Sequence, residues 1–311
     1  MNETTYREAD TAFWAAHRLR PREHDVRLAA TGTRVRIQEL GEGPPILFLH
    51  GSQSAGSAWA PLLEHLHGFR FLVPDLPGAG LSEPFEVRAS NLEAYGGRLV
   101  ADLLDGVGLD RAHVVASSLG GHLALRSAAS DPDRFHRMVL MGCPALAPGE
   151  THPPFMRMIS NPIVRRLVTL LPPSAGVDRS VFRQLGHGAS LDADRLSPAF
   201  LAWNLELQRH TDTHAHHVAT IADLVAAGDR ARLDRRLLGS VPVRTLFLWG
   251  ENDGFGGESV ARGVVQAMPK AELTLVPDGG HLPWIDDPRG VAQRVHAYLS
   301  RAVPGEGETR L

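Results

Sequence analysis

Short apolar or β-branched runs alternate along the chain with stretches whose apolar residues recur at helical spacing. The runs are uniformly apolar, which is typical of central parallel strands that are covered on both sides. The pattern predicts a mostly parallel sheet with helices on both faces, an α/β fold. We expect strands at residues 34–40, 46–50, 69–74, 112–116, 138–141, 243–249 and 272–276.

Two helix starts carry capping signals. Ser90 and Glu93 have the spacing of a capping box at the head of a helix that continues with apolar residues three and four apart. Near the end of the chain, Asp287 and Pro288 are a suitable N-cap and first helical residue. We therefore expect helices over roughly residues 91–107 and 288–299.

One region breaks the alternation. From about residue 144 to residue 240 there is no convincing strand, only helical stretches punctuated by Pro and Gly. A helical insertion between two strands of a parallel sheet predicts a cap over the strand ends, where open α/β sheets bind ligands. The predicted division is an N-terminal extension (1–24) with a short amphipathic helix in "FWAAHRLR", a core (25–143 and 241–302), a helical cap (144–240) and a flexible tail (303–311).

The stretch "HVVASSLGGH" places two serines where a predicted strand turns into a predicted helix. A side chain at the tip of such a sharp turn is exposed only if the residues two before and two after it are small. With Ser117 at the tip these neighbours are a valine and a leucine, whereas with Ser118 they are Ala116 and Gly120. Ser118 is therefore the candidate nucleophile, and the alternative is a serine that only caps the helix.

Four further motifs follow one another in a recognisable order. They are "FLHGSQSAGSAW" (48–59), "PDLPGAGLS" (74–82), "LWGENDGF" (248–255) and "DGGHLPWIDDP" (278–288). Together with the serine turn they resemble the α/β-hydrolase fold superfamily, specifically its serine-nucleophile hydrolases with a helical cap. The turn departs from that family at Ala116, where glycine is commoner. The resemblance implies a doubly wound, mostly parallel sheet of the eight-stranded type.

The resemblance also implies a catalytic triad. Ser118 would attack a carbonyl, His281 would be its general base, and Asp253 would accept a hydrogen bond from the other imidazole nitrogen. A second position for the acid, used by some members, holds Cys143 and Pro144 here. The chain order serine, aspartate, histidine is the order expected of this fold.

The remaining site residues follow from position in these motifs. The backbone N–H groups of Ser52 and Leu119 are the expected oxyanion hole, with Gln53 in reserve. Gln53, Trp203 and Leu282 are candidates for contact with substrate.

Several polar residues near the motifs are expected to be structural. Asp278, Asp286 and Asp287 lie close to His281 in the sequence and are expected to cap helices or close turns. Asp75 begins a Gly-containing turn that lets its loop pass close to the site.

A histidine cluster lies in "QRHTDTHAHHVATI". His210, His214 and His217 share one possible helix face, with His216 beside them, so a metal site is conceivable from their spacing. No acidic ligand is paired with them, and the mechanism of this fold needs no metal. We expect them on the cap surface or at the substrate entrance, and we expect no metal and no cofactor.

Composition narrows the function classes. The 311 residues carry a formal net charge of −3, so nucleic acid and anionic membranes are not expected partners. Cys143 is the only cysteine, which excludes an intrachain disulfide. The chain has neither a signal-peptide core nor a membrane-spanning apolar run, so we expect a cytoplasmic location.

The sequence therefore predicts an enzyme, a serine hydrolase that cleaves a carboxylic ester of a small organic molecule through an acyl-enzyme. The alternative enzyme is a carbon–carbon bond hydrolase acting on a vinylogous diketone. "HGSQSAG" partly resembles the oxyanion loop of those enzymes but lacks their proline, and Leu282 stands where they often have tryptophan. Lactone and thioester hydrolysis stay open, as does a slow-turnover ligand receptor on the same fold.

Overall fold

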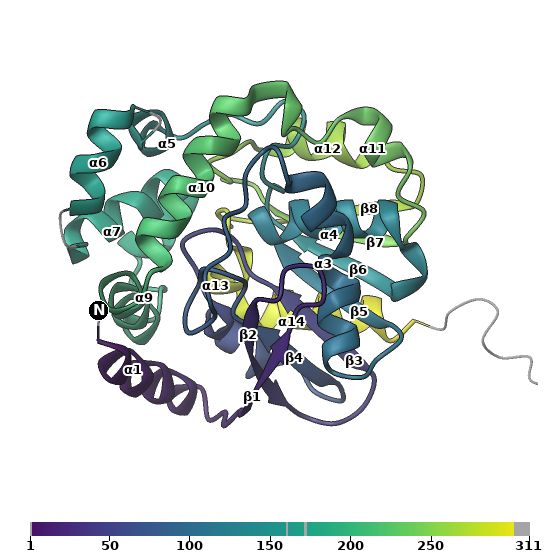
Figure 1. Ribbon diagram of the computed structural model, residues 1–311, viewed down its shortest axis with the longest axis horizontal. Coiled ribbons are helices and arrows are strands. Elements are labelled where there is room, and N and C mark those ends of the chain that lie inside the picture. The colour runs from purple at the N-terminus through teal and green to yellow at the C-terminus, as the bar shows by residue number, and fades with distance from the viewer. Residues whose placement is uncertain (1, 160, 171–172, 302–311) are drawn as a thin grey trace, which may run out of the picture.

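A single eight-stranded sheet forms the centre of the computed structural model, which describes residues 2–159, 161–170 and 173–301 (Figure 1). The strand order is β1-β2-β4-β3-β5-β6-β7-β8, and only the pairs β1–β2 and β2–β4 are antiparallel. The predicted mostly parallel α/β sheet is thus confirmed. The strands are β1 (Arg22–Arg27), β2 (Arg34–Leu40), β3 (Pro45–Leu49), β4 (Arg70–Pro74), β5 (Ala112–Ser117), β6 (Phe135–Met141), β7 (Thr245–Gly250) and β8 (Ala271–Val276).

Every expected strand is present, but β1 was not anticipated. Its sequence "REHDVR" is almost entirely polar, and only Val26 is buried. An edge strand with one covered position has no apolar run, so hydrophobic patterning cannot detect it. The N-terminal extension, predicted to end at residue 24, therefore overlaps the sheet, which begins at Arg22.

The sheet separates two apolar layers, and alternate residues of each strand enter one layer or the other. In β3, Leu47 and Leu49 belong to one layer, while Ile46 and Phe48 belong to the other. Covering both faces explains why the central strands are apolar at nearly every position. The first layer contains α3 (Leu92–Gly106), α4 (Ser118–Ser130) and α12 (Glu258–Gln266), and the second contains α1 (Glu3–Ala16), α2 (Ala60–Leu63), α13 (Pro283–Asp286) and α14 (Pro288–Leu299).

One of the two capping predictions is confirmed. The Asp287 side chain accepts the N–H of Gly290 at 2.9 Å at the head of α14. The capping box at Ser90 is wrong, because α3 has Asn91 as its N-cap and no side-chain capping bond. Asn91 Oδ1 instead accepts the N–H of Arg88 at 2.8 Å, which closes the preceding turn.

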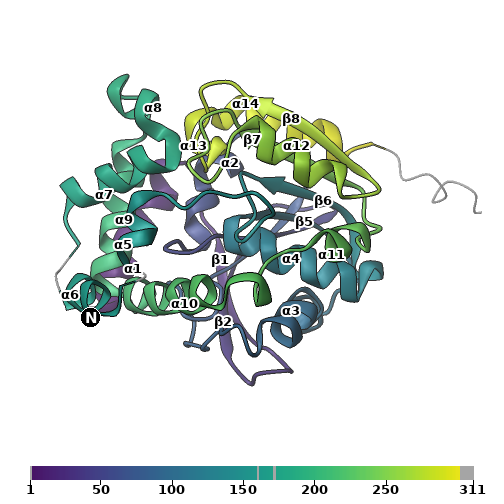
Figure 2. The ribbon, with the colours of Figure 1, turned by 90° about the horizontal axis from the view of Figure 1, so that it is seen from above.

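Helices fill the described chain between β6 and β7, with no strand among those residues. Most of them gather beside the sheet, next to α1 (Figures 1 and 2). The boundaries of the cap at residues 144 and 240 stay a prediction, and the tail at 303–311 lies outside the described residues. The helices are α5 (Pro154–Ile159), α6 (Pro162–Leu170), α7 (Ala175–Phe182), the π-helical turn η3 (Arg183–His187), α8 (Gly188–Asp192), α9 (Pro198–His210), α10 (Thr213–Ala227), the 3₁₀ turn η4 (Gly228–Arg230) and α11 (Arg235–Gly239).

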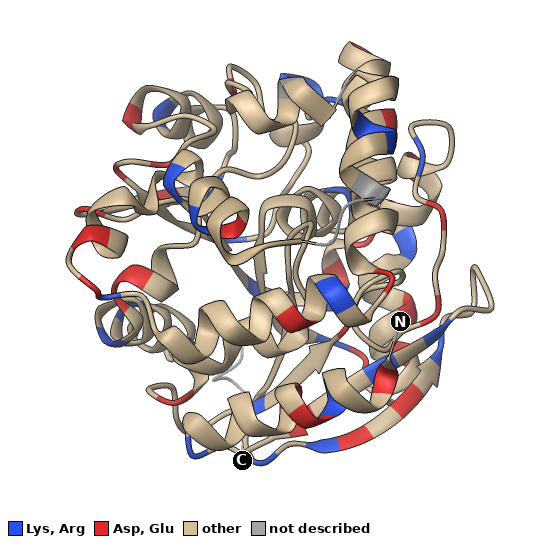
Figure 3. Cartoon of the chain, turned by 90° about the vertical axis from the view of Figure 1, so that its left-hand side faces the viewer, with Lys and Arg blue, Asp and Glu red and all other residues tan. Residues whose placement is uncertain are grey.

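Charged residues of both signs are interspersed along the elements in Figure 3, in keeping with the small net charge. Among the described residues, no helix combines the length and the apolar character that crossing a bilayer would require.

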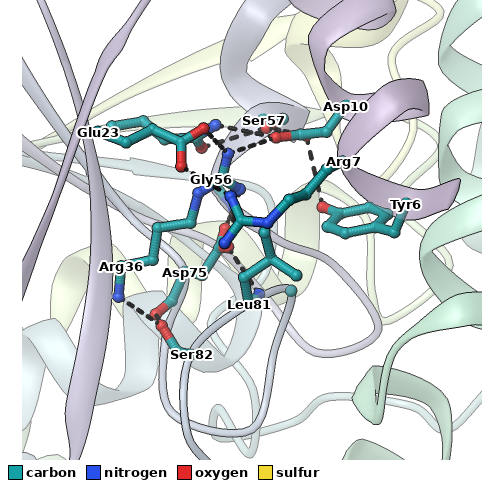
Figure 4. Close-up of polar contacts among 12 residues, drawn as sticks. Tyr6, Arg7, Asp10, Glu23, Arg36, Gly56, Ser57, Asp75, Leu81 and Ser82 are labelled. Atoms are coloured by element: carbon teal, nitrogen blue, oxygen red, sulfur yellow. Dashed lines mark hydrogen bonds and ion pairs between the residues drawn. The ribbon is translucent and has the colours of Figure 1, made fainter. Parts of the chain in front are cut away.

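A buried polar network fixes α1 to the rest of the molecule (Figure 4). The α1 carboxylate of Asp10 accepts hydrogen bonds from Arg36 of β2, from Ser57 after β3, and from Trp203 of α9. Arg36 also pairs with Asp75, whose carboxylate accepts the N–H of Gly56 at 2.8 Å. The network therefore connects α1, the sheet, an inserted helix and the loop that follows β3.

We expect Asp10→Ala to lower the free energy of unfolding by about 3 kcal/mol, because several buried donors lose their acceptor at once. Glu3→Ala is the control, since Glu3 belongs to an exposed ion pair with Arg7 on the same helix and should cost less than about 0.5 kcal/mol. Urea denaturation of both variants measures the difference. Equal stabilities would contradict the structural role of the network.

Candidate active site

The predicted site residues come together at the carboxyl edge of the sheet. Ser52 follows β3, Ser118 follows β5, Asp253 follows β7 and His281 follows β8. Carboxyl ends of neighbouring parallel strands meet at one edge, where open α/β sheets hold their ligands. A cavity of about 230 Å³ opens there, and Ser52, Ser118 and His281 all line it.

The structure distinguishes the two adjacent serines. Ser118 is the first residue of α4, has a φ of 51° and lines the cavity, whereas Ser117 is 0% exposed. A Cβ on Gly120 would lie 2.3 Å from the carbonyl oxygen of Leu49. The steric argument made from the sequence therefore applies: the turn exists because position 120 has no side chain.

The imidazole ring of His281 is hydrogen-bonded through only one of its two nitrogens among the described residues. Its Nδ1 lies 3.0 Å from both carboxylate oxygens of Asp253. The same carboxylate accepts the N–H groups of Cys143 at 2.8 Å and of Phe255 at 2.9 Å. Donation from Nδ1 leaves Nε2 as an acceptor, and within the described part of the chain that buried Nε2 has no hydrogen-bond partner. Ser118 and His281 both line the cavity, but no hydrogen bond joins them among the described residues.

The turn η3, which belongs to the inserted helices, is hydrogen-bonded to the loops that carry Asp253 and His281. The Leu185 carbonyl accepts the N–H of His281 at 2.8 Å and the N–H of Gly254 at 3.3 Å. Gly186 has a φ of 96°, and a Cβ there would lie 1.9 Å from the carbonyl oxygen of Asn252. The close approach of η3 thus depends on glycine.

A second buried histidine–aspartate pair lies beside the first. His187 Nδ1 and Asp286 Oδ2 are 2.8 Å apart, and His187 Nε2 accepts the N–H of Leu282 at 3.3 Å. Asp286 Oδ2 also accepts the N–H of Gly280 at 2.8 Å. The two amides flank His281, so this pair fixes its loop. Sequence analysis gave Asp286 a turn-closing role, which the geometry agrees with, but missed His187.

Of the expected oxyanion donors, the N–H groups of Ser52 and Leu119 have no acceptor among the described residues, whereas that of the reserve, Gln53, is occupied. Leu119 lies in the first turn of α4, where an N–H has no intrahelical acceptor. No hydrogen bond among the described residues uses the N–H of Ser52. Gln53, by contrast, donates its N–H to His217 Nδ1 at 2.8 Å, which argues against it as a donor to substrate.

Two histidines of the predicted cluster, His214 and His217, contact Gln53 in the loop that follows β3. Burial lowers the pKa of His217 well below its usual value, which keeps Nδ1 an acceptor. His214 Nδ1 lies 3.2 Å from Gln53 Oε1 and lines the cavity, whereas His210 pairs with Glu206. Among the described residues, no group of three or more His, Cys, Asp or Glu is arranged to hold a metal ion.

The prediction that Trp203 contacts substrate is wrong. Its Nε1 donates to Asp10 at 3.0 Å, and its ring stacks on Phe13 with centroids 5.0 Å apart. The indole therefore packs between α9 and α1, and it does not line the cavity. Gln53 and Leu282, the other candidates, do line it.

The cavity walls are mainly apolar, with a few polar groups that sequence analysis missed. Burial raises the pKa of Asp178 to about 6, against the effect of a hydrogen bond from Asn204 Nδ2 at 2.8 Å. Asn204 and Gln208 are one helical turn apart in "NLELQ", a spacing that could have marked them as one polar face. The apolar lining includes Phe155, Met156, Met158, Ile159, Val181, Phe182, Phe200, Val218, Ile221, Leu224, Phe255 and Trp284.

Comparison with known proteins identifies relatives over most of the chain. A protein-family model described as alpha/beta hydrolase fold matches residues 44–288. A curated 2-hydroxy-6-oxononadienedioate/2-hydroxy-6-oxononatrienedioate hydrolase of Cupriavidus pinatubonensis is 27% identical over 263 residues, 81% of this chain and 85% of that protein. A 2-hydroxy-6-oxo-6-phenylhexa-2,4-dienoate hydrolase of Burkholderia cepacia is 27% identical over 80% of this chain and 85% of its own.

Solved structures show the same architecture. The carboxylesterase CesB of Bacillus subtilis superposes with a TM-score of 0.77 at 20% identity, covering 97% of this chain and 99% of that one. The 2-hydroxy-6-oxo-6-phenylhexa-2,4-dienoate hydrolase of Rhodococcus sp. strain RHA1 has a TM-score of 0.72 at 18% identity, covering 91% and 100%. At these identities the likeness concerns the fold.

We expect His187→Ala to lower the free energy of unfolding by about 2–4 kcal/mol, because buried hydrogen-bond partners are left unpaired. The amides of Gly280 and Leu282 should then exchange with deuterium faster than in the unchanged protein. His210→Ala, which removes a partly exposed pairing, is the control. Unchanged exchange in segment 279–283 would contradict the bracing role of His187.

We expect Asp178→Asn to stabilise the protein at pH 8 by about 1–2 kcal/mol and to have little effect at pH 4. The folded-state pKa of about 6 lies above the ordinary 3.8, so the folded state holds the proton more tightly. Stability is therefore lost as pH rises from about 4 through 6, and asparagine, which cannot ionise, avoids this loss. Thermal unfolding at both pH values measures it, and the reverse pH dependence would contradict the assignment.

Proposed function

The chain belongs to the α/β-hydrolase fold family, and on that premise we propose that it is a serine hydrolase acting on a small organic molecule. Ser118 is the nucleophile, His281 the general base and Asp253 the residue that orients His281. One observation carries this proposal: Asp253 fixes Nδ1 of His281, while Nε2 is buried without a hydrogen-bond partner among the described residues, and His281 and Ser118 line the same cavity.

The proposed reaction has two halves. As Ser118 Oγ attacks the carbonyl carbon, His281 Nε2 takes the hydroxyl proton, and the N–H groups of Ser52 and Leu119 stabilise the oxyanion. The imidazolium, stabilised by Asp253, then gives that proton to the leaving group as the bond to the carbonyl carbon breaks. A water molecule, deprotonated by His281, attacks the acyl-enzyme and releases the acid and free Ser118.

The leaving group defines the reaction. In ester hydrolysis it is an alcohol, and in carbon–carbon hydrolysis it is the enolate carbon of a vinylogous diketone. The curated relatives are named for hydrolysis of 2-hydroxy-6-oxo dienoates, so carbon–carbon hydrolysis takes first place.

Ester hydrolysis, which sequence analysis placed first, is the second candidate. Leu282 lines the cavity where the carbon–carbon hydrolases often have tryptophan, and the loop after β3 lacks their proline.

The only cysteine, Cys143, is buried and unpaired, which is compatible with the reducing cytoplasm that we propose as the location.

A fluorophosphonate should form one covalent adduct on the native protein, and Ser118→Ala should abolish it. Ser117→Ala is a matched control, because the neighbouring Ser117 hydroxyl is buried and outside the cavity. His281→Ala should slow labelling by at least about a hundredfold, since the hydroxyl loses its base. Intact-protein mass spectrometry measures all of these. An adduct that survives Ser118→Ala rules out the proposed nucleophile. A protein whose Ser118 can be labelled, but whose turnover of substrates without the label is too slow to measure, would favour the receptor alternative.

The two reactions are separated by kcat/KM for 2-hydroxy-6-oxo-6-phenylhexa-2,4-dienoate and for p-nitrophenyl acyl esters. A preference of about a hundredfold, or 2.7 kcal/mol of transition-state binding, assigns the reaction. We expect the dienoate to be preferred. A hundredfold preference for the esters would reverse the order of the two candidates.

A further inference from the structure

A strip of hydrogen-bonding side chains runs through the otherwise apolar cavity. Gln208 and Asn204 lie four residues apart on α9, so they share one face of that helix about 6 Å apart, and both line the cavity. Asp178 of α7 accepts a hydrogen bond from Asn204 and also lines the cavity. We refer to Gln208, Asn204 and Asp178 as the acceptor strip.

The strip begins beside the proposed oxyanion loop. Gln208 Nε2 donates to the Gln53 carbonyl oxygen at 2.7 Å, which fixes the orientation of the Gln208 amide. Its Oε1 is therefore the remaining polar atom, and it is buried without a hydrogen-bond partner among the described residues. A buried acceptor without a donor is unfavourable, because the group has lost its hydrogen bonds to water, so a ligand that supplies the donor recovers this free energy.

The strip ends at a carboxyl group. Asn204 Nδ2 donates to Asp178 Oδ1, which leaves Asn204 Oδ1 and Asp178 Oδ2 as further acceptors. Val177, next to Asp178, is 62% exposed and lines the cavity, so this end lies near the opening.

The charges of the described lining have one sign. They are the carboxyl groups of Asp178 and Glu150, with no Arg or Lys side chain among the described lining residues. Glu150 is already engaged by the N–H of Leu146 and by His152. Asp178 is therefore the charged group left for a ligand.

We propose that the acceptor strip recognises a hydrogen-bond donor, a hydroxyl or an ammonium group, at the far end of the acyl part of the substrate, the part that stays on Ser118 after the first half of the reaction. The same strip disfavours a carboxylate at that position, because like charges repel in a partly desolvated site. This inference rests on the proposed function and specifies its substrate class. The leaving part, which carries the carboxylate in 2-hydroxy-6-oxo-6-phenylhexa-2,4-dienoate, does not enter it, so the inference applies to carbon–carbon and to ester hydrolysis alike.

A series of p-nitrophenyl alkylphosphonates tests the inference without a choice of reaction. The members carry four to eight carbons and end in a methyl, a hydroxyl, an ammonium or a carboxylate group. Each phosphonylates the nucleophilic serine with release of p-nitrophenolate, so the second-order rate constant reports how well the terminal group fits. At the best length and at pH 8, we expect the hydroxyl and ammonium members to react at least about tenfold faster than the carboxylate member.

Two variants assign the effect to the strip. Asp178→Asn should remove most of the advantage of ammonium over carboxylate, and Gln208→Met, which lacks an acceptor, should reduce the advantage of hydroxyl over methyl. Asp229→Asn is the control for charge, since Asp229 is fully exposed on η4, and it should leave every ratio unchanged.

The outcomes separate the inference from the function it rests on. A carboxylate member that reacts fastest, or ratios that Asp178→Asn and Gln208→Met leave unchanged, overturns the inference while Ser118 remains the labelled nucleophile. Failure of every member to label Ser118 overturns the proposed function, and the inference with it.

Discussion

The carboxylate of Asp253 accepts hydrogen bonds from three separate parts of the chain: the imidazole of His281, the N–H of Cys143 after β6 and the N–H of Phe255 in its own loop. Because a buried carboxylate is costly unless it is surrounded by donors, this convergence fixes where the ends of β6, β7 and β8 must lie relative to one another. The hydrogen bonds from Nδ1 to Asp253 then fix the ring of His281, which lines the cavity. The proposed chemistry and the shape of the cavity both depend on this arrangement.

The inserted helices contribute to this arrangement as well as covering it. Through Leu185 and His187, the turn η3 holds the loops on both sides of Asp253 and His281. On the opposite side, Trp203 of α9 reaches the buried network around Asp10, which also holds the loop after β3. Gln208 of α9 also donates directly to the Gln53 carbonyl, so the inserted region is hydrogen-bonded both to the loop with the expected oxyanion donor and to the loops with the expected acid and base.

Local rules explain what could be predicted from the sequence. Apolar runs identified the central strands, and the need for small residues two positions from a strained turn selected Ser118 over Ser117. Asp253 and His281 came from resemblance to a family. What was missed depends on distant partners: β1 is polar and recognisable only by its pairing with β2, and Trp203 faces Asp10 from 193 residues away in the sequence. His187 likewise acquires its role only beside Asp286 and Leu282.

The most direct test of the account is a crystal structure of the protein after reaction with a small fluorophosphonate, whose phosphoryl oxygen imitates the oxyanion. The account predicts phosphorus bonded to Ser118 Oγ, with the phosphoryl oxygen about 2.7–3.1 Å from the backbone nitrogens of Ser52 and Leu119. His281 Nε2 should face the adduct while Nδ1 stays on Asp253. A phosphoryl oxygen bound elsewhere, or an imidazole turned away from the adduct, would contradict it.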